Sequence, residues 1–201
     1  MIRHPTPPEL QLNGAFAPDQ TGLGEWARTC FIEDGNPLTN PEHRHLQAAR
    51  IGWLWTNYDA RSVGRAIAGE ASMPRSGSRW GQQRAMFQLE EWFGMIPDFI
   101  ITISAPIAQT LDDASFCALI EHELFHCAQA LDEFGVPRFT REGLPVFALR
   151  GHDVEQFVGV VRRYGSHAAG VSELVHAALV GPTVQDGAVE AACGSCLRRA
   201  A

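Results

Sequence analysis

Runs and alternations of apolar residues predict two β-strands in the first half of the chain. The clearest is PDFIITISA (97–105), in which four β-favouring residues follow Asp98 in a row. The second, SVGRAIAGEAS (62–72), alternates small apolar and polar residues, and its glycines allow another part of the protein to approach the backbone closely. Both segments are therefore expected to be strands.

Helical patterns lie around these strands. We expect a first helix over residues 22–33 and another over residues 78–94, which Gly94 ends. A further helix begins after Asn40, a favourable N-cap residue, with Pro41 at its first position. Its apolar residues point to all sides of the helical wheel, which predicts a mostly buried helix: Leu46, Ile51, Trp53, Leu54 and Trp55.

The helix expected over residues 113–132 separates two kinds of side chain on its surface. Positions four apart differ by only about 40° around a helix axis, so His122 and His126 project side by side and can reach one ion. An apolar stripe that suits the core runs along roughly the opposite side: Phe116, Ile120, Leu124, Cys127 and Leu131. A metal site built on a core helix requires this separation.

Short extended pieces are expected after that helix. PRFT (137–140) and LPVFALR (144–150) are joined by a turn at REG (141–143). A helix is then predicted over residues 152–165 and a last helix over residues 169–180. The first of these two helices has an apolar stripe formed by Val154, Phe157, Val158 and Val161.

The bulk properties indicate an ordinary globular protein. The chain has 201 residues and is 45% hydrophobic, which is enough for one domain with a buried core. We expect a loose arm over residues 1–20, one domain over residues 21–180 and a mobile tail over residues 181–201. The net charge of −7 argues against nucleic acid or an anionic membrane as the main partner, because both favour basic surfaces.

Sequence features also indicate a location in the cell. The N-terminus MIRHPTPPELQLNGAF lacks the apolar segment of a secretory signal, and no apolar run reaches membrane-spanning length. The five cysteines are an odd number, which fits reduced thiols in a cytoplasm. Cys193 and Cys196 have the spacing of redox and zinc motifs, but they lack a second pair and lie near the last residue. We expect them to be exposed thiols in the tail.

Residues 122–126 read HELFH, the HExxH pattern of zinc hydrolases. The two histidines supply two zinc ligands, and Glu123 lies near the metal without having to bind it. From there Glu123 can take a proton from a zinc-bound water, whose pKa the metal lowers towards about 7. His43 and His45 are two residues apart and point about 200° away from each other on a regular helix, so a surface or capping role is expected for them.

Catalytic zinc usually has three protein ligands and one open position. His152 follows an extended segment and is expected to open a helix, so that the strand aims the side chain and the helix start holds it. Glu155 is the alternative, because a His-His-Glu set is equally good chemistry for zinc. A peptidase also needs an oxyanion donor, for which Arg162, Arg163 and Tyr164 are candidates, although such charges also suit a solvated helix C-terminus.

Several segments together resemble a known family. ALIEHELFHCAQALDEFGVPRF followed by GHDVEQFVGVVRRYG is similar to the putative phage metallopeptidase family, which is found in phages and prophages. HLQAARIGWLW and DFIITISAPIA resemble the upstream segments of that family, so the likeness covers roughly residues 40–165. More distantly, the helix and the later Gly-His pair are similar to SprT-like zinc peptidases, in which the histidine after that glycine completes the site.

This resemblance implies an α+β, zincin-like fold, in which a small mixed sheet packs on the HExxH helix. It implies zinc as the cofactor, Glu123 as the base, and His122, His126 and His152 as the metal ligands, and it thereby favours the histidine over its rival as third ligand. In many zincin folds an edge strand precedes the motif helix, so the 97–105 strand is expected at a sheet edge, where an extended substrate could pair with it.

Two functions of different classes are open. The first is a cytoplasmic zinc metallopeptidase, encoded by a phage or prophage, that hydrolyses a peptide or protein substrate. The alternative is a metal-stabilised module that binds a host protein without turnover. Glu123 discriminates between them, because a purely structural metal site does not need a base beside it. No membrane partner is expected, and the pattern does not indicate an oligomeric state.

Overall fold

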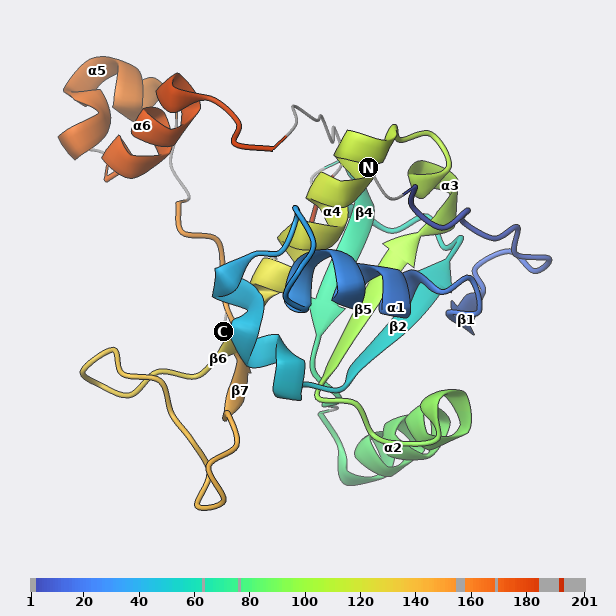
Figure 1. Ribbon diagram of the computed structural model, residues 1–201. Helices are drawn as coiled ribbons and strands as arrows, with labels where there is room; N and C mark the ends of the chain where they lie inside the picture. The colour runs from blue at the N-terminus through green and yellow to red at the C-terminus, as the bar shows by residue number, and fades with distance from the viewer. Residues whose placement is uncertain are drawn as a thin grey trace. The chain divides into compact units, whose positions relative to one another are not determined.

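The computed structural model describes residues 3–62, 64–75, 77–154, 158–168, 170–184 and 192–193. These residues form a mixed α+β architecture with one principal sheet and several helices (Figure 1). The chain divides into two compact units, Met1–Arg150 with Gly187–Ala201, and Gly151–Asp186. Within the described residues, every helix is too short or too polar to cross a lipid bilayer.

The principal sheet belongs to the first unit. Its strands are β1 (Phe16–Pro18), β2 (Ile51–Thr56), β3 (Arg61–Ser62), β4 (Arg65–Ser72), β5 (Phe99–Ser104) and β8 (Ala192–Cys193). The order across the sheet is β1-β2-β5-β4-β3, and β8 also pairs with β4. The β2–β5 and β4–β8 pairs are parallel, and the other pairs are antiparallel, so the sheet is mixed. The sequence pattern predicted β4 and β5, and both are confirmed.

One face of this sheet carries α1 (Leu23–Ala27), the π-helical turn η1 (Arg28–Ile32) and α4 (Asp113–His126) (Figure 1). The predicted first helix is therefore confirmed, although it is divided into α1 and η1. The core lies between these helices and the sheet, and its largest fully buried side chains include Phe31, Trp55, Phe99, Ile101, Ile103, Phe116, Ile120 and Leu124.

The opposite face of the sheet meets α2 (Arg79–Phe93). Here the ring of Phe93 lies over Gly52 of β2, where there is no side chain to displace it. At the start of α2, the Ser78 hydroxyl accepts a hydrogen bond from the Gly81 amide at 3.0 Å. Gly94 ends the helix with a φ of 67°, as predicted, because glycine adopts this left-handed conformation without strain.

The prediction of one buried helix from Pro41 through Trp55 is wrong. The segment forms a 3-10 helix, η2 (Pro41–Ala48), and then strand β2. Asn40 does cap η2, since its side chain accepts from the Glu42 amide at 3.0 Å. The apolar residues that follow form strand β2, which α1 contacts on one face, at Trp53, and α2 on the other, at Gly52. An apolar pattern on all sides does not distinguish that strand from a buried helix.

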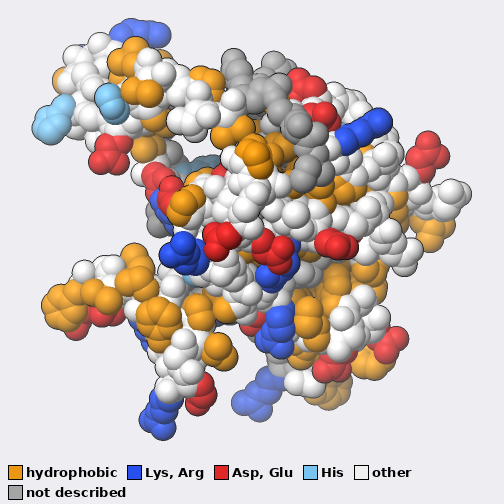
Figure 2. Space-filling model, in the orientation of Figure 1, with side chains coloured by type: hydrophobic (Ala, Val, Ile, Leu, Met, Phe, Trp, Pro, Cys, Tyr) orange, Lys and Arg blue, Asp and Glu red, His pale blue; other side chains and the backbone are white. Residues whose placement is uncertain are grey.

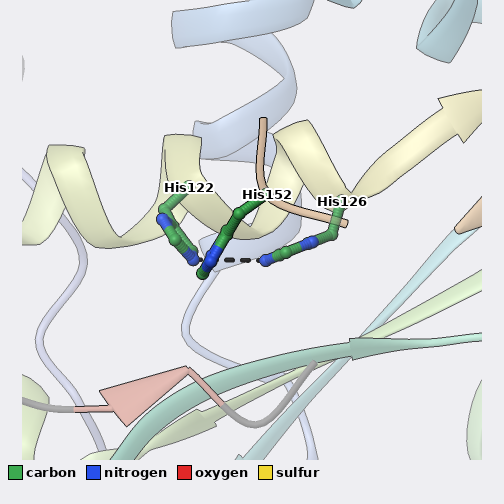
Figure 3. Close-up of side chains that lie close together, drawn as sticks. All are labelled: His122, His126 and His152. Carbon is green, nitrogen blue, oxygen red and sulfur yellow. Dashed lines mark hydrogen bonds between the residues drawn. The ribbon is translucent and has the colours of Figure 1, made fainter. Parts of the chain in front are cut away.

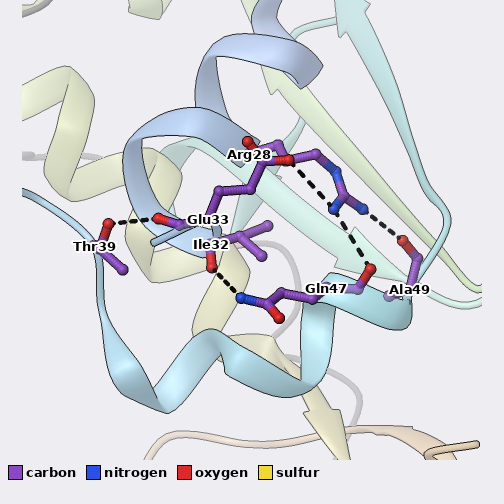
Figure 4. A network of polar contacts seen from close by, with 6 residues as sticks. All are labelled: Arg28, Ile32, Glu33, Thr39, Gln47 and Ala49. Carbon is purple, nitrogen blue, oxygen red and sulfur yellow. Dashed lines mark hydrogen bonds and ion pairs between the residues drawn. The ribbon is translucent and has the colours of Figure 1, made fainter. Parts of the chain in front are cut away.

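Polar contacts hold η2 against η1 (Figure 4). The Arg28 guanidinium donates through Nη2 to the Ala49 carbonyl at 3.1 Å. The Gln47 amide donates to the Ile32 carbonyl at 3.2 Å. These bonds join two short irregular helices and fix η2 relative to η1.

The expectation that the 97–105 strand lies at a sheet edge is also wrong. β5 is hydrogen-bonded to β2 on one side and to β4 on the other. A strand with partners on both sides cannot accept an extended peptide. Strand β4, on the far side of β5 from β2, is the strand that lies near the outer edge, where its partners are the two-residue strands β3 and β8.

Helix α4 follows β5 and the short helix α3 (Ala105–Ala108), and it ends at His126 rather than at residue 132 as predicted. The next residues form β6 (Cys127–Gln129), which pairs with β7 (Phe147–Leu149). Residues paired in β6 cannot also continue the helix, so α4 ends at the residue before β6 begins. As a result Leu131 is not part of a core stripe, and 57% of it is exposed.

Two turns lie between β6 and β7, at Gly135 and Gly143, and both glycines have positive φ. Isolated bridges join Leu131 to Pro137 and Phe139 to Pro145, so the two extended pieces and the turn between them are confirmed. Apolar side chains cover much of the surface of this segment (Figure 2). The exposed ones are Leu131, Phe134, Val136, Phe139 and Leu144.

The second unit contains α5 (Val158–Ala168) and α6 (Ser172–Val180). The predicted last helix is confirmed as α6. The predicted helix over 152–165 is wrong at its start, because residues 152–154 are not helical, and residues 155–157 lie outside the described part of the chain. Gly165, with a φ of 82°, interrupts α5. Apolar side chains of α5 and α6 line a hollow within this unit, with Val158, Val161, Val171, Leu174 and Val175 among them.

Candidate metal centre

Helix α4 is held rigidly at its N-terminus and along its core face. The Asp112 carboxylate accepts a hydrogen bond from the Ser115 amide at 2.8 Å, and this bond lowers the pKa of Asp112 below its usual value. Phe116, Ile120 and Leu124 are fully buried against the sheet. The packing of this apolar side fixes the rotation of α4 about its axis, and thereby the direction in which His122 and His126 point.

Three histidines converge beside α4 (Figure 3). His122 and His126 project from the same side of the helix, and His152 reaches them from the segment that follows Arg150. One ring nitrogen from each histidine lies within 4.8 Å of those of the other two. The Nε2 atoms of His122 and His126 are 3.2 Å apart.

Two hydrogen bonds between His126 and Arg150 bring the third histidine to the other two. The Arg150 amide donates to the His126 carbonyl at 3.0 Å, which extends the pairing of β6 with β7 by one residue. His126 Nδ1 lies 2.7 Å from the Arg150 carbonyl oxygen and must donate to it, since that oxygen can only accept. His152 is only two residues further along the chain, so its backbone is tethered near His126.

The same contact sets the chemistry of His126. With its proton on Nδ1, the ring has its lone pair on Nε2, the atom that faces His122. A hydrogen bond from the remote ring nitrogen to a carbonyl is the usual means of orienting a metal-binding imidazole. His126 is also only 3% exposed, so few other orientations are open to its ring.

Glu123, the neighbour of His122 in the chain, is completely buried. Its side chain lies against Gly69 of strand β4. Its backbone carbonyl accepts a hydrogen bond from Cys127 Sγ at 3.5 Å. Burial, followed by the nearby Glu123 carboxylate, raises the pKa of the Cys127 thiol, which is therefore a protonated core residue and not a nucleophile.

A second polar cluster supports α4 from η2. Asn40 Nδ2 donates to the Glu121 carboxylate at 2.7 Å, and His43 Nε2 is 3.7 Å from the same oxygen, too far for a hydrogen bond. Burial raises the pKa of Glu121, but His43 and Asn40 lower it by more, so the net shift is downward. His45 Nε2 donates to the Cys127 carbonyl at 2.7 Å, directly after α4 ends.

The surface role expected for His43 is wrong, because only 1% of this residue is exposed and its ring packs on Phe125 with centroids 4.7 Å apart. The 3-10 geometry of η2 and its contact with α4 turn His43 inward. His45 instead reaches a carbonyl of another element, that of Cys127 at the start of β6. Sequence reasoning missed the contacts of His43 with Phe125 and of His45 with Cys127 because each joins residues about 80 positions apart.

Four other candidate residues and a cysteine pair came from the sequence. Of these, Glu155 and Cys196 lie outside the described residues. Arg162, Arg163 and Tyr164 are exposed on α5, where the Arg163 guanidinium lies 5.5 Å from the Tyr164 ring centre. Cys193 belongs to β8, so the backbone at this position pairs with the sheet.

The donor set fits a zinc ion. Imidazole nitrogen is a common zinc ligand, and tetrahedral coordination at about 2.0–2.1 Å places neighbouring nitrogens roughly 3.3 Å apart. The observed separation of the His122 and His126 Nε2 atoms is 3.2 Å. Among the described residues three histidines converge, and a zinc site with three protein donors and one open position is of the catalytic and not the structural kind.

The chain was compared with protein families, curated proteins and solved structures. A family model described as "Putative phage metallopeptidase" matches residues 24–179, which is most of the chain and includes all three histidines. No curated protein and no solved structure matches the chain.

Proposed function

The chain belongs to the putative phage metallopeptidase family, and from this membership we propose that it is a zinc-dependent peptidase of the HExxH type. His122, His126 and His152 would hold the ion, and Glu123 would be the general base. The substrate would be a peptide or protein in the cytoplasm of a host cell, since the family description points to a phage or prophage origin. The packing of α4 on a mixed sheet is compatible with a zincin-like fold.

The observation that carries this proposal is the convergence of three imidazoles beside a helix that also carries a buried carboxylate. A zinc ion in such a site supplies Lewis acidity towards the peptide carbonyl and lowers the pKa of a water molecule to about 7. The chain supplies the orientation: His126 is fixed by Arg150, and His122 by its place one helical turn earlier.

Glu123 would carry the proton in this reaction. Its carboxylate would accept a proton from the attacking water and donate it to the leaving nitrogen as the peptide bond breaks. The complete burial of Glu123 limits its motion and excludes competing bulk water.

A metal-stabilised binding module is the second candidate function. Glu123 distinguishes it from a peptidase. The three histidines would serve either function, but only hydrolysis requires a base, and Glu123 is the residue proposed for that role. The test is therefore a comparison of the parent protein with Glu123→Gln, which keeps the shape of the side chain and removes its basicity.

Each protein would be incubated with a bacterial lysate, and new protein N-termini would be mapped by mass spectrometry. We expect cleavages that the parent produces and Glu123→Gln does not, with a rate loss of about 10²- to 10⁴-fold on any cleaved peptide. Zinc content, measured by elemental analysis, should be equal in the two proteins. Equal cleavage by both would overturn the role of Glu123, and the absence of cleavage by the parent would favour the binding module.

A further inference from the structure

Gly69 of β4 lies directly against Glu123. A Cβ atom at position 69 would be 2.7 Å from Glu123 Oε1, 2.9 Å from its Cγ and 3.0 Å from its Cδ. Real carbon atoms do not approach this closely, so any side chain at position 69 would displace the carboxylate. The clash involves Cγ as well as the terminal oxygen, and a small rotation of the carboxyl group alone would not relieve it.

Neither backbone is free to retreat from such a clash. Gly69 pairs with Ile103 of β5 on one side and with Cys193 of β8 on the other. Helix α4 is held by the Asp112 cap, by Asn40, which caps η2, and by His45 of η2. The Glu123 side chain is therefore the part that must move.

The backbone conformation at position 69 does not explain why the residue there is a glycine. Its φ lies outside the positive range, so an L-residue can adopt the same backbone angles, unlike Gly94 or Gly143. The reason for a glycine here is space and not backbone freedom. A glycine within a strand often marks such a close approach.

We propose that Gly69 is a positioning residue for the reaction: the absence of a side chain at this position sets where the Glu123 carboxylate lies. This inference rests on the proposed function, because position matters only if Glu123 exchanges a proton with a reacting group. A general base must lie within hydrogen-bonding reach of that group, and a displacement of about 1 Å can reduce the rate by about 10²-fold.

The substitution that tests this is Gly69→Ala. We expect kcat to fall by about 10²-fold, while KM and the zinc content stay within about twofold of the parent, since neither the ligands nor the substrate surface changes. A purely structural role for Gly69 would lower stability without this selective loss of kcat.

Gly52→Ala is the matched control. A Cβ at Gly52 would meet the Phe93 ring at 2.8 Å, so this change creates an equally close clash in the same sheet, on the face away from Glu123. Gly77→Ala, where a Cβ meets nothing within 4 Å, controls for the loss of a glycine as such. We expect Gly52→Ala to lower Tm by about 2–10 °C, as over-packing does, and to leave kcat unchanged.

Stability provides a readout that does not depend on hydrolysis. Gly69→Ala should lower Tm in the parent but much less in a Glu123→Ala background, where the clashing atoms are gone. Gly52→Ala should lower Tm equally in both backgrounds. Additive Tm losses for Gly69→Ala and Glu123→Ala, or a Gly69→Ala protein with the kcat of the parent, would overturn the inference. If the parent hydrolyses nothing, the proposed function fails, while the Tm coupling still decides whether Gly69 places Glu123.

Discussion

At the scale of single residues, the backbone carbonyl of Arg150 determines the tautomer of His126. The Arg150 carbonyl accepts from His126 Nδ1, and this bond selects the ring nitrogen that faces the other two histidines. The HExxH spacing places two imidazoles on one side of a helix, but it does not choose their tautomers. That choice comes from a residue 24 positions further along the chain.

The metal content follows from these residues. We expect the purified protein to hold about one zinc per chain. His122→Ala, His126→Ala or His152→Ala should weaken zinc binding by more than about 100-fold, because changing only the neighbours of ligands already costs about 10- to 100-fold. Competition with a chromophoric chelator measures this affinity. His176→Ala, on the exposed surface of α6, is the matched control and should bind zinc as the parent does.

The choice between His152 and Glu155 is part of the same measurement. If the histidine is the third ligand, Glu155→Ala retains the affinity that His152→Ala loses. The reverse result would make Glu155 the ligand and leave the proposed enzyme class unchanged. Full zinc occupancy after replacement of both His122 and His126 would contradict the site altogether.

At the scale of the elements, short irregular segments position the helix of the site. Helix α4 packs on the sheet through one side, while η2 contacts it through Asn40, His43 and His45. The start of α1 depends on Asp19, whose carboxylate accepts from the Thr21 and Gly24 amides at 2.9 and 3.2 Å and from Trp55 Nε1 at 2.9 Å. Asp19 thereby joins α1 to strand β2.

Asp19 should make the stability of the protein depend on pH. Burial raises the pKa of Asp19, but its hydrogen bonds to Thr21, Trp55 and Gly24 lower it by more, so the folded-state pKa lies below the ordinary value of 3.8. A lowered pKa contributes stability that is fully present above pH 3.8 and is lost as the pH falls through the folded-state value.

Asp19→Asn should remove this contribution. We expect a loss of about 1–2 kcal/mol at pH 7, because an amide nitrogen cannot accept from the Gly24 amide, and we expect the difference from the parent to shrink below about pH 4. Urea unfolding at several pH values measures both effects. Asp59→Asn, an exposed partner of Arg61, should change little at any pH. A pH-independent difference for Asp19→Asn would contradict the explanation.

At the scale of the whole molecule, the proposed metal site would link metal binding to folding. The proposed ligands come from α4 and from residue 152, and their nitrogen atoms converge where β6 and β7 are paired. An ion that binds the folded chain and not the unfolded chain adds to the free energy of unfolding. The site should therefore contribute to stability as well as to chemistry.

Removal of the metal should lower Tm. With zinc at about a thousand times its Kd, the added stability is about 4 kcal/mol, which corresponds to a Tm shift of roughly 8–16 °C for a chain of this size. Calorimetry with and without a chelator measures the shift. A variant with both His122 and His126 replaced by Ala should show no effect of the chelator, and an equal shift in that variant would contradict the linkage.

The sequence alone determined the features that depend on local periodicity. Two histidines four residues apart share one side of any α-helix, so HELFH indicated a metal-binding helix without knowledge of the fold. The strand over 97–105, helix α2 and the turn at Gly143 were likewise predictable, because short-range propensities and a few special residues define them.

Only the tertiary structure decided the features that depend on distant partners. β2 is a strand because β1 and β5 lie on either side of it, and β5 is central because β4 pairs with its other edge. Helix α4 ends at His126 because β7, about 20 residues away in the chain, pairs with the next residues. The contact of Gly69 with Glu123 is of the same kind, since 54 positions separate them and only the packing of α4 on β4 brings them together.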